Sequence, residues 1–252
     1  MTSSAAERLV RHVPVGISAE ALLEQWARRE AAPEGAAVVL DVEIAARTRG
    51  GAEWRQQDAV AVAVLGRPAS LAVEQADLAW AAASLGAARA LDDLSGGPHD
   101  CLWPDQVSGS RLEAEVAVSA RTALGPGHVN HVSLVARVGP WPSATRDQLS
   151  RVLVNRLREV AAALGDPTSV LNDYRTRCAL IDEHVEIDLL PHGSLRGRVI
   201  TVDEACSLVL VSPTGLRERV PLQAVARVRV SAPPSATGAD PLDSGGATNQ
   251  TP

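Results

Sequence analysis

Apolar residues recur every three or four positions in several stretches of the chain, and this spacing predicts amphipathic helices with one face turned to a core. Ser18 and Thr145 directly precede two of these stretches. Both residue types are favoured N-caps because their side-chain oxygens accept a backbone N–H. The predicted helices cover residues 19–29, 71–91, 145–164 and 169–177.

Short apolar or alternating runs between the helices, bounded by Gly and Pro, predict strands. Residues 112–119 and 131–138 flank the turn Gly125-Pro126-Gly127 and therefore predict a hairpin. Further strands are expected over residues 37–44, 59–65 and 100–103, with an Arg- and Gly-rich loop over 45–57.

The pattern changes after residue 180, where short β segments follow one another with close turns. Such a series predicts a small β-barrel. These strands cover residues 184–190, 195–202, 207–211, 217–222 and 225–230. We therefore expect an α+β domain over residues 1–180, a small barrel over 181–231 and a tail over 232–252, whose Pro, Ser, Thr, Gly and Asp content is typical of disorder.

Composition constrains the core and the chemistry. The 252 residues include 24 basic residues, all of them Arg, together with five Trp, one Tyr and no Phe. The core must therefore consist of Ala, Val and Leu with Trp as its main large ring, and abundant Ala and Arg without Lys are typical of GC-rich coding. A chain without Lys cannot form a Schiff base, use a P-loop lysine or acylate its own lysine.

Charge and hydropathy narrow the classes of partner. A net charge of −6 argues against a dedicated nucleic-acid binder. No apolar run is long enough for a transmembrane helix, and residues 1–11 lack a signal-peptide pattern. Cys101, Cys178 and Cys206 are far apart and form no CxxC pair, which favours a reducing, cytoplasmic environment without a zinc site.

Two segments contain candidate site residues. The first reads Ala46-Arg47-Thr48-Arg49-Gly50-Gly51-Ala52-Glu53-Trp54. Its arginines offer planar guanidinium groups that bind phosphate or carboxylate oxygens in pairs. The second reads Leu102-Trp103-Pro104-Asp105-Gln106-Val107 and is followed by Arg111-Leu112.

In this order and spacing, the two segments resemble the biotin–protein ligase family, within the wider biotin and lipoate ligase fold. The first is similar to the family's G-R-G-R-R-G-R-x-W loop, and the second to its K-W-P-N-D-hydrophobic motif followed by K-L-A-G. Residues 185–230 are similar to its C-terminal barrel. The resemblance covers about residues 15–230 and implies an α+β, class II synthetase-like catalytic domain with a mixed sheet, followed by an SH3-like barrel.

The resemblance also implies a reaction. Family members activate the carboxylate of biotin with ATP, normally accompanied by Mg²⁺, and pass the acyl group from an acyl-adenylate to a lysine of a biotin carboxyl carrier domain of an acyl-CoA carboxylase. Sheet-edge homodimers are common among them. We see no N-terminal DNA-binding helices in the pattern and expect no repressor function, no nucleic-acid partner and no membrane partner.

Site roles follow from the matched positions. By resemblance, Arg47 and Arg49 would hold the adenylate and Arg111 the carboxylate. Gly51 and Trp54 would belong to the loop that closes over it. Three further candidates for substrate or nucleotide binding are Trp103, Asp105 and Ser18, which keeps one hydroxyl of an early Ser-Thr-Asn motif that helps to hold biotin.

The chain departs from the family pattern at several chemical positions. Leu102 replaces a lysine, Asp105-Gln106 replaces Asn-Asp, and Arg111 replaces a lysine that addresses the reactive carboxylate. The glycines and the asparagine of a later strand motif are absent from residues 134–138. The scaffold pattern persists while the chemical positions change, which is the signature of a ligase fold whose activity has decayed or changed.

Each candidate residue also has a structural explanation. Arg47 and Arg49 suit a solvated loop, and Arg111 suits a surface salt bridge. Trp54 and Trp103 suit core packing in a chain with few large rings. The remaining structural alternatives are an N-cap at Ser18, a turn at Asp105, an exposed hairpin at His128 and His131, and an inert buried thiol at Cys101.

Two functional hypotheses result. In the first, the chain is a biotin–protein ligase of the type that acts on acetyl-CoA carboxylase. In the second, it is a catalytically decayed homologue that binds a nucleotide, a carrier domain or another partner. A ligase with a changed acid substrate is a third alternative.

Overall fold

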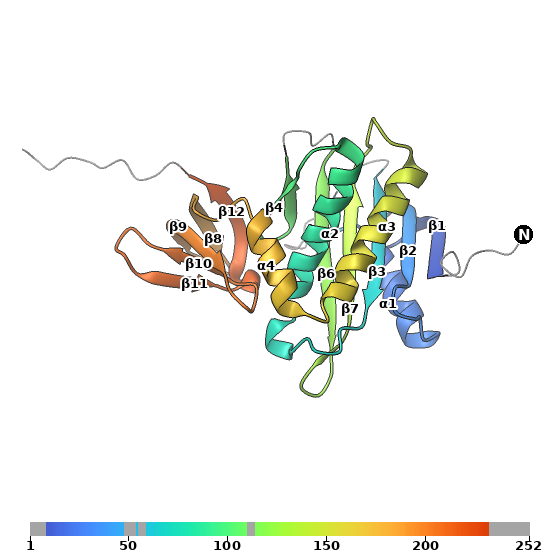
Figure 1. Ribbon diagram of the computed structural model, residues 1–252, viewed down its shortest axis with the longest axis horizontal. Helices are drawn as coiled ribbons and strands as arrows, with labels where there is room; N and C mark the ends of the chain where they lie inside the picture. Colours follow the sequence, from blue (N-terminus) through green and yellow to red (C-terminus); the bar gives the residue numbers. More distant parts are fainter. Residues whose placement is uncertain (1–8, 48–53, 55–58, 110–113, 232–252) are drawn as a thin grey trace, which may run out of the picture.

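A computed structural model describes residues 9–47, 54, 59–109 and 114–231 of the chain (Figure 1). Its centre is a five-stranded sheet in the order β1-β2-β3-β7-β6. The parallel pairing of β1 with β2 and the antiparallel pairing of the others make the sheet mixed, as expected. The strands are β1 (Val10–Gly16), β2 (Ala37–Glu43), β3 (Val60–Gly66), β6 (Val116–Leu124) and β7 (Val129–Val138).

Helix α1 (Ala19–Arg29) has the predicted bounds. The Ser18 side chain accepts the backbone N–H of Ala21, which confirms the predicted N-cap. The helix buries Leu23 and Trp26 against one face of the sheet, where they pack with Leu40 and Val135. Because side chains alternate along a strand, this face receives every second residue of β7.

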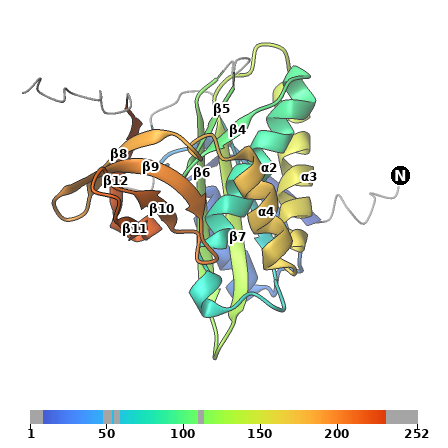
Figure 2. The same ribbon diagram turned by 60° about the vertical axis from the view of Figure 1, so that its left-hand side comes forward.

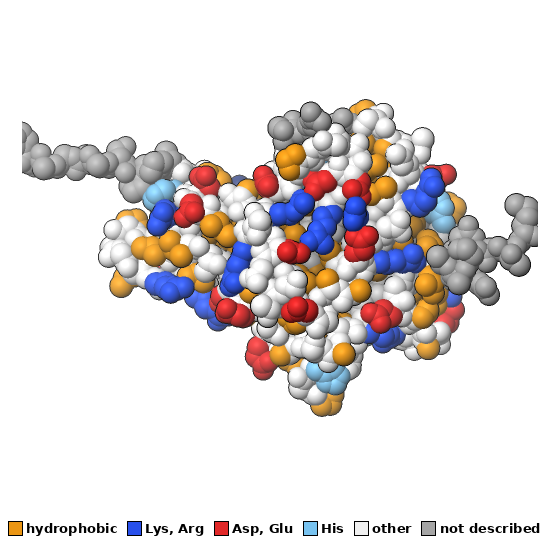
Figure 3. Space-filling model, in the orientation of Figure 1, with side chains coloured by type: hydrophobic (Ala, Val, Ile, Leu, Met, Phe, Trp, Pro, Cys, Tyr) orange, Lys and Arg blue, Asp and Glu red, His pale blue; other side chains and the backbone are white. Residues whose placement is uncertain are grey.

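The opposite face is covered by α2 (Leu78–Ser95) and α3 (Arg146–Ala163), which lie side by side, and α4 (Pro167–Arg177) packs against α2 (Figure 1). Thr145 caps α3 as predicted. Charged side chains of both signs are interleaved over the outer surface of these helices (Figure 3). Among them are the pairs Arg156–Asp93 and Arg89–Asp173.

Helix α2 differs from its prediction over residues 71–91. A short 3-10 helix (Val73–Gln75) precedes it, and α2 continues through the polar residues Asp92 and Asp93 to Gly96, whose left-handed φ of 66° ends the helix. The helix is buried on nearly all sides because the sheet, α3 and α4 surround it. Its alanines therefore do not form the single apolar stripe that the spacing suggested.

The hairpin of β6 and β7 is confirmed but is longer than predicted. Pairing continues to Leu124 and Val129 on either side of the glycine turn. The added residues of β6 include Arg121 and Thr122, whose polar side chains obscure the strand pattern on an edge strand. A second, two-stranded sheet joins β4 (Asp100–Leu102) and β5 (Gln106–Ser108), the latter missed by the sequence pattern.

The C-terminal β domain is a separate five-stranded antiparallel sheet in the order β11-β10-β9-β8-β12. All five expected strands are present within two residues of their predicted bounds. A 3-10 helix (Leu222–Ala224) connects the last two strands. The strands are β8 (His184–Leu189), β9 (Ser194–Val202), β10 (Leu208–Val211), β11 (Arg217–Val220) and β12 (Val225–Val230).

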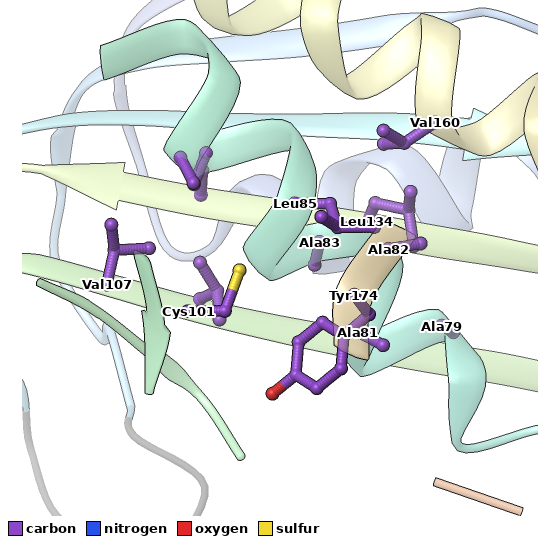
Figure 4. Packing of buried hydrophobic residues seen from close by; sticks show 14 of the residues in the cluster. Ala79, Ala81, Ala82, Ala83, Leu85, Cys101, Val107, Leu134, Val160 and Tyr174 are labelled. Carbon is purple, nitrogen blue, oxygen red and sulfur yellow. The ribbon is translucent and has the colours of Figure 1, made fainter. Parts of the chain in front are cut away.

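This sheet lies beside α4 in both views of the molecule (Figures 1 and 2). One hydrophobic cluster runs without a break from the central sheet through α2 and α4 into the C-terminal strands. Tyr174 of α4 is fully buried in it and lies against the alanines of α2 (Figure 4). Two hydrogen bonds fasten the junction: Trp103 Nε1 donates to the Cys206 carbonyl at 2.9 Å, and Gln223 Nε2 donates to Asp77 Oδ1 at 2.7 Å.

The change in architecture after α4 agrees with a division near residue 180, and the exact domain boundaries stay a prediction. The tail expected over residues 232–252 lies outside the described residues. Among the helices that the structure describes, none has the length and hydropathy required to cross a membrane.

Candidate functional site

A pocket of about 360 Å³ is lined by residues from the start of α1, the segment after β2, strands β6 and β7, and α2, and we call it the α1 pocket. Its wall combines two arginines, two serines, a glutamate and an indole from segments far apart in sequence. The lining residues are Ser18, Glu20, Ala45, Arg47, Trp80, Ser119, Ala120 and Arg137.

The first turn of α1 forms one side of the pocket. Ser18 caps the helix, and the backbone N–H of Ala19 donates to Glu43 Oε1 at 2.9 Å. Glu20, in the same turn, lies 3.4 Å from Arg121 of β6. Glu43 and the Ser18 hydroxyl thus already accept N–H groups of this turn, and Glu20 adds a carboxylate to the pocket wall.

Arg137 is the charged group at the buried end of the pocket. It lies on β7 among apolar neighbours, and its side chain is only 4% exposed. Its Nε donates to Glu43 Oε2 at 2.5 Å, its Nη2 to Glu43 Oε1 at 3.2 Å, and its Nη1 to Ser119 Oγ at 2.9 Å. A buried guanidinium in an apolar strand is retained only when such partners compensate for its lost hydration.

Arg47 is exposed and lines the same pocket, at the start of the Arg- and Gly-rich loop. The pocket therefore runs from a solvent-exposed guanidinium to a buried one. Arg49, Gly51 and Arg111, three of the predicted site residues, lie outside the described residues.

Trp54 lies at the far end of the same loop, in a small cluster with Ala46, Ala59 and Ala117. The residue is 8% exposed, and its Nε1 donates to Glu115 Oε1 at 3.0 Å. Trp54 is not among the residues lining the α1 pocket. The observed contacts anchor the loop's end against the edge strand β6.

Trp103 and Asp105 lie between β4 and β5; Trp103 belongs to the main hydrophobic cluster, and Asp105 lies beside the edge strand β6. Trp103 is 2% exposed and is fixed by its bond to the Cys206 carbonyl. Asp105 is half-buried, and its carbonyl accepts the Val118 N–H at 3.2 Å. The structure thus brings Ser18 and Arg47 together and places Trp54, Trp103 and Asp105 elsewhere.

The sequence reasoning did not identify the lining residues Glu20, Trp80, Ser119 and Arg137, nor Glu43, which binds Arg137. For Arg137 a signal existed, because it is the only charged residue in the apolar run from Val132 to Val138. A charge in a buried strand needs a partner or a ligand. Its partner Glu43 is distant in sequence and carried no comparable signal.

Two further sequence candidates have structural partners. His128 Nδ1 lies 3.0 Å from the Pro126 carbonyl, whereas His131 Nε2 lies 3.2 Å from Glu24, so the two rings face different groups. Cys101 is fully buried, and burial raises the pKa of its thiol, which disfavours a nucleophilic thiolate. Within the described ranges, no group of three or more His, Cys, Asp or Glu is placed to hold a metal ion.

A larger cavity of about 530 Å³ lies in the C-terminal sheet, between β8, β9 and the turn after β10. Its lining includes Glu186, Arg196 and Arg198. None of the sequence-predicted site residues that the structure describes lines this cavity, so the α1 pocket is the better candidate site.

No protein-family model matches the chain, and no curated protein matches its sequence. Solved structures do match its fold. A biotin protein ligase from Aquifex aeolicus in complex with biotin and ATP has a TM-score of 0.66 at 16% identity, with 88% of this chain and 99% of that chain covered. A biotin protein ligase from Leishmania major in complex with biotinyl-5-AMP has a TM-score of 0.56 at 12% identity, with 84% and 98% covered.

A biotin protein ligase-like protein of unknown function from Silicibacter is also similar, with a TM-score of 0.53 at 16% identity and coverage of 85% and 94%. These matches span both the central sheet and the C-terminal β domain of this chain, and the neighbours are matched over nearly their whole length. The chain therefore has a biotin protein ligase-like fold.

Proposed function

We propose that the chain binds an organic acid in the α1 pocket, activates its carboxylate with ATP and transfers the acyl group to a lysine of a biotin carboxyl carrier domain. One observation carries the proposal: Ser18, Arg47 and Arg137 line a single pocket although they come from three distant segments. By resemblance, Ser18 falls in the motif that helps to hold biotin, Arg47 in the adenylate loop and Arg137 in the later strand motif. Biotin is the first acid to test, because solved neighbours with this fold were crystallised with it.

The groups around the pocket suit this chemistry. A carboxylate and a triphosphate repel each other, so their approach requires cationic donors near both. In the proposal, Arg47 and Arg49 hold the phosphate oxygens of the adenylate, and Arg111 holds the carboxylate. The carboxylate oxygen attacks the α-phosphorus of ATP and pyrophosphate leaves; the carrier lysine then attacks the acyl carbon and AMP leaves.

The remaining predicted residues act as supports in this scheme. Gly51 lets the loop close, and Trp54 holds the loop's end through Glu115. Trp103 and Asp105, in the turn between β4 and β5, would act through the position of the Arg111 segment. Mg²⁺ would arrive with ATP and keep most of its contacts to phosphate and water, which is its usual behaviour in such sites.

The cellular setting is part of the proposal. Cys101, Cys178 and Cys206 are free thiols, which supports a reducing cytoplasm. The outer edge of β1 ends the central sheet. Pairing of two such edges would give the homodimer that the resemblance implies.

The decisive experiment combines calorimetry with a turnover assay. Biotin and ATP are titrated separately and together, and pyrophosphate release is then followed with both present. Binding of both ligands with pyrophosphate release supports the proposal, and Arg47→Ala should weaken the synergy between them. Absence of binding by either ligand would contradict it.

A second function, binding without turnover, is favoured by Leu102. Leu102 stands where the family has a lysine, and it lies in β4 packed against the main hydrophobic cluster. By resemblance a positive charge is missing there, and the partly buried side chain packs against the core instead. If both ligands bind without pyrophosphate release and Leu102→Lys restores release, this one loss explains the inactivity; a Leu102→Met variant is the matched control.

A further inference from the structure

Two cysteines lie opposite each other where β4 meets the end of α4. Cys101 of β4 and Cys178, the residue that follows the last turn of α4, form an isolated parallel β-bridge. Across this bridge the backbone N–H of Ala179 donates to the Cys101 carbonyl at 3.0 Å. Figure 4 shows Cys101 in the main hydrophobic cluster together with Tyr174 of α4. Both thiols are free and buried, so the bridge holds them next to each other inside the protein.

The spacing of the bridge suits a disulfide bond. Neighbouring strands lie about 4.7–4.9 Å apart, and the Cα atoms of disulfide-bonded cysteines are usually about 4.4–6.8 Å apart. Residues paired in a bridge lie at the same point of the pleat, so their side chains point to the same side. Cys101 and Cys178 can therefore be joined with little movement of the backbone.

The third cysteine provides an internal comparison. Cys206 is also free and buried, and it lies in the turn between β9 and β10 with a left-handed φ of 60°. Within the described residues, no strand pairing or bridge sets Cys206 opposite another cysteine. The geometry thus distinguishes one pair of thiols from the remaining one.

The two thiols of the bridge differ in their access to a reagent. Cys178 is 6% exposed, whereas Cys101 is fully buried. Burial raises the pKa of both thiols. At Cys178 the opposite effect on the pKa comes from nearby backbone N–H groups, those of Leu180, Ile181 and Trp103. A reaction with an oxidant therefore starts at Cys178, and it is slow because the thiolate is disfavoured in the closed fold.

We propose that Cys101 and Cys178 form a reversible disulfide when the protein meets a low-molecular-weight disulfide such as oxidised glutathione. The Cys178 thiolate attacks one sulfur of the oxidant, and a first small thiolate leaves. The Cys101 thiolate then attacks Cys178 Sγ in the mixed disulfide, and a second small thiolate leaves. The two protons of the protein thiols pass to the released thiolates, so the protein loses two electrons and the small disulfide is reduced to two thiols.

The bond fastens β4 to α4 at the junction with the C-terminal β domain. β4 leads into the turn that holds Trp103, whose indole donates to the Cys206 carbonyl. The loop that the bond closes runs from residue 101 to residue 178 and includes β6, β7 and α3. Closing such a loop restricts the unfolded chain and thereby stabilises the fold. The bond requires neither the α1 pocket nor a ligand, so it goes beyond the proposed function and is tested without it.

Peptide mapping of the full chain tests the pairing directly. Because the chain has no Lys, trypsin cleaves it only after Arg, and the three cysteines fall in separate peptides: 90–111, 178–196 and 199–217. The chain is incubated with oxidised glutathione, and the remaining thiols are alkylated in urea before digestion. We expect one alkylated thiol, at Cys206, and a disulfide that joins peptides 90–111 and 178–196 of one chain. Three alkylated thiols, a mixed disulfide alone, or a link to peptide 199–217 would overturn the proposal.

Matched variants assign the link to the bridge. Cys206→Ala keeps both thiols of the bridge and should form the link as the native chain does. Cys178→Ala removes one partner and should leave Cys101 and Cys206 as thiols. If oxidised Cys178→Ala joins these two instead at the same rate, the bridge does not direct the reaction. The peptide map of the native chain decides the pairing even where a variant fails to fold.

Thermal unfolding reports whether the bond fits the native fold. We expect the oxidised chain to unfold at least about 5 °C above the reduced chain, with the same rise in Cys206→Ala and its reversal by dithiothreitol. An unchanged or lower unfolding temperature in a chain that carries the mapped link would show that the bond strains the bridge, and a fastening role at the junction would be refuted.

Discussion

The two faces of the central sheet differ in whether their buried polar groups have hydrogen-bond partners. On the α1 side, the buried charges are joined in networks: Arg137 with Glu43 and Ser119, and Glu24 with His131 and Ser133. On the α2 side, four buried polar atoms have no hydrogen-bond partner among the described residues: Ser84 Oγ, His99 Nε2, Trp141 Nε1 and Tyr174 Oη.

The two faces therefore contribute differently: the α2 side stabilises the fold by hydrophobic burial, whereas the α1 side holds polar groups in defined positions. The α2 side is one large apolar cluster that extends into the C-terminal domain, and its burial of hydrophobic surface outweighs a few unsatisfied polar atoms. The α1 side has a much smaller apolar cluster. Its charges are held in defined positions by partners, which is the property a binding pocket requires.

The largest change in the free energy of unfolding is expected from breaking a hydrogen-bonded charge network on the α1 side. Arg137→Met leaves the Glu43 carboxylate buried without its partner and should lower the free energy of unfolding by about 3–5 kcal/mol in urea titrations. Arg156→Met is the control on the other face, where the partly exposed pair with Asp93 should contribute at most about 1 kcal/mol. Similar losses for the two variants would remove the distinction between the faces.

The second α1-side network makes stability depend on pH. Hydrogen bonds from His131, with Ser133 and Arg28 assisting, lower the pKa of Glu24 from 4.5 to about 2. Because the folded-state pKa lies below the unfolded one, the stabilisation is complete above pH 4.5 and is lost as the pH falls towards 2. Acid unfolding curves should show a loss of about 2 kcal/mol that is absent in Glu24→Gln.

On the α2 side, the hydrogen bond of Trp103 at the junction with the C-terminal domain shows how much one polar contact contributes to the free energy of unfolding. Trp103→Phe keeps an aromatic ring but removes the bond to the Cys206 carbonyl. We expect a loss of about 1–2 kcal/mol in thermal or urea unfolding. Trp141→Phe is the matched control, because Trp141 is also buried and its indole N–H has no partner among the described residues. An equal loss in Trp141→Phe would show that the hydrogen bond of Trp103 contributes nothing to the free energy of unfolding.

The smallest expected change in the free energy of unfolding is a gain in stability. Tyr174→Phe removes a buried hydroxyl that has no partner among the described residues and should leave stability unchanged or raise it by up to about 1 kcal/mol. Burial also raises the pKa of this phenol, so it stays neutral throughout the accessible pH range. Ser133→Ala on the α1 side should instead destabilise, because its hydroxyl donates to Glu24. A destabilised Tyr174→Phe would show that this hydroxyl does have a stabilising contact.

Local patterns were sufficient for most of the secondary structure. Helix α1 was predicted to the residue because its N-cap, its periodic Leu and Trp positions and its breaking Pro and Gly lie within one short segment. The C-terminal strands were found for the same reason, since Gly and Pro turns delimit each one. Helix α2 was misplaced at both ends, because an alanine-rich helix buried on all sides has no polar face to mark its limits.

The positions of the candidate site residues could be predicted only in part from the same local patterns. The side-by-side placement of Ser18 and Arg47 followed from their positions at the starts of a helix and a loop that lie next to each other, and resemblance to a family pointed to both. Trp54 and Trp103 match that family's motifs, yet their contacts are with Glu115 and the Cys206 carbonyl. A motif specifies residue types and spacing, whereas the direction of a side chain depends on what packs around it.

Most of the order of helices and strands, with β1 and β5 as exceptions, the α+β class and the change to a small β domain after residue 180 could therefore be predicted from the amino acids alone, because hydrophobic period and turn residues act over short stretches. The pairing of Arg137 with Glu43 was not, because 94 residues separate them and only the assembled sheet brings them within hydrogen-bonding distance. The composition of the pocket is a property of that assembly: distant segments contribute polar side chains to one place, and no single segment contains the site that results.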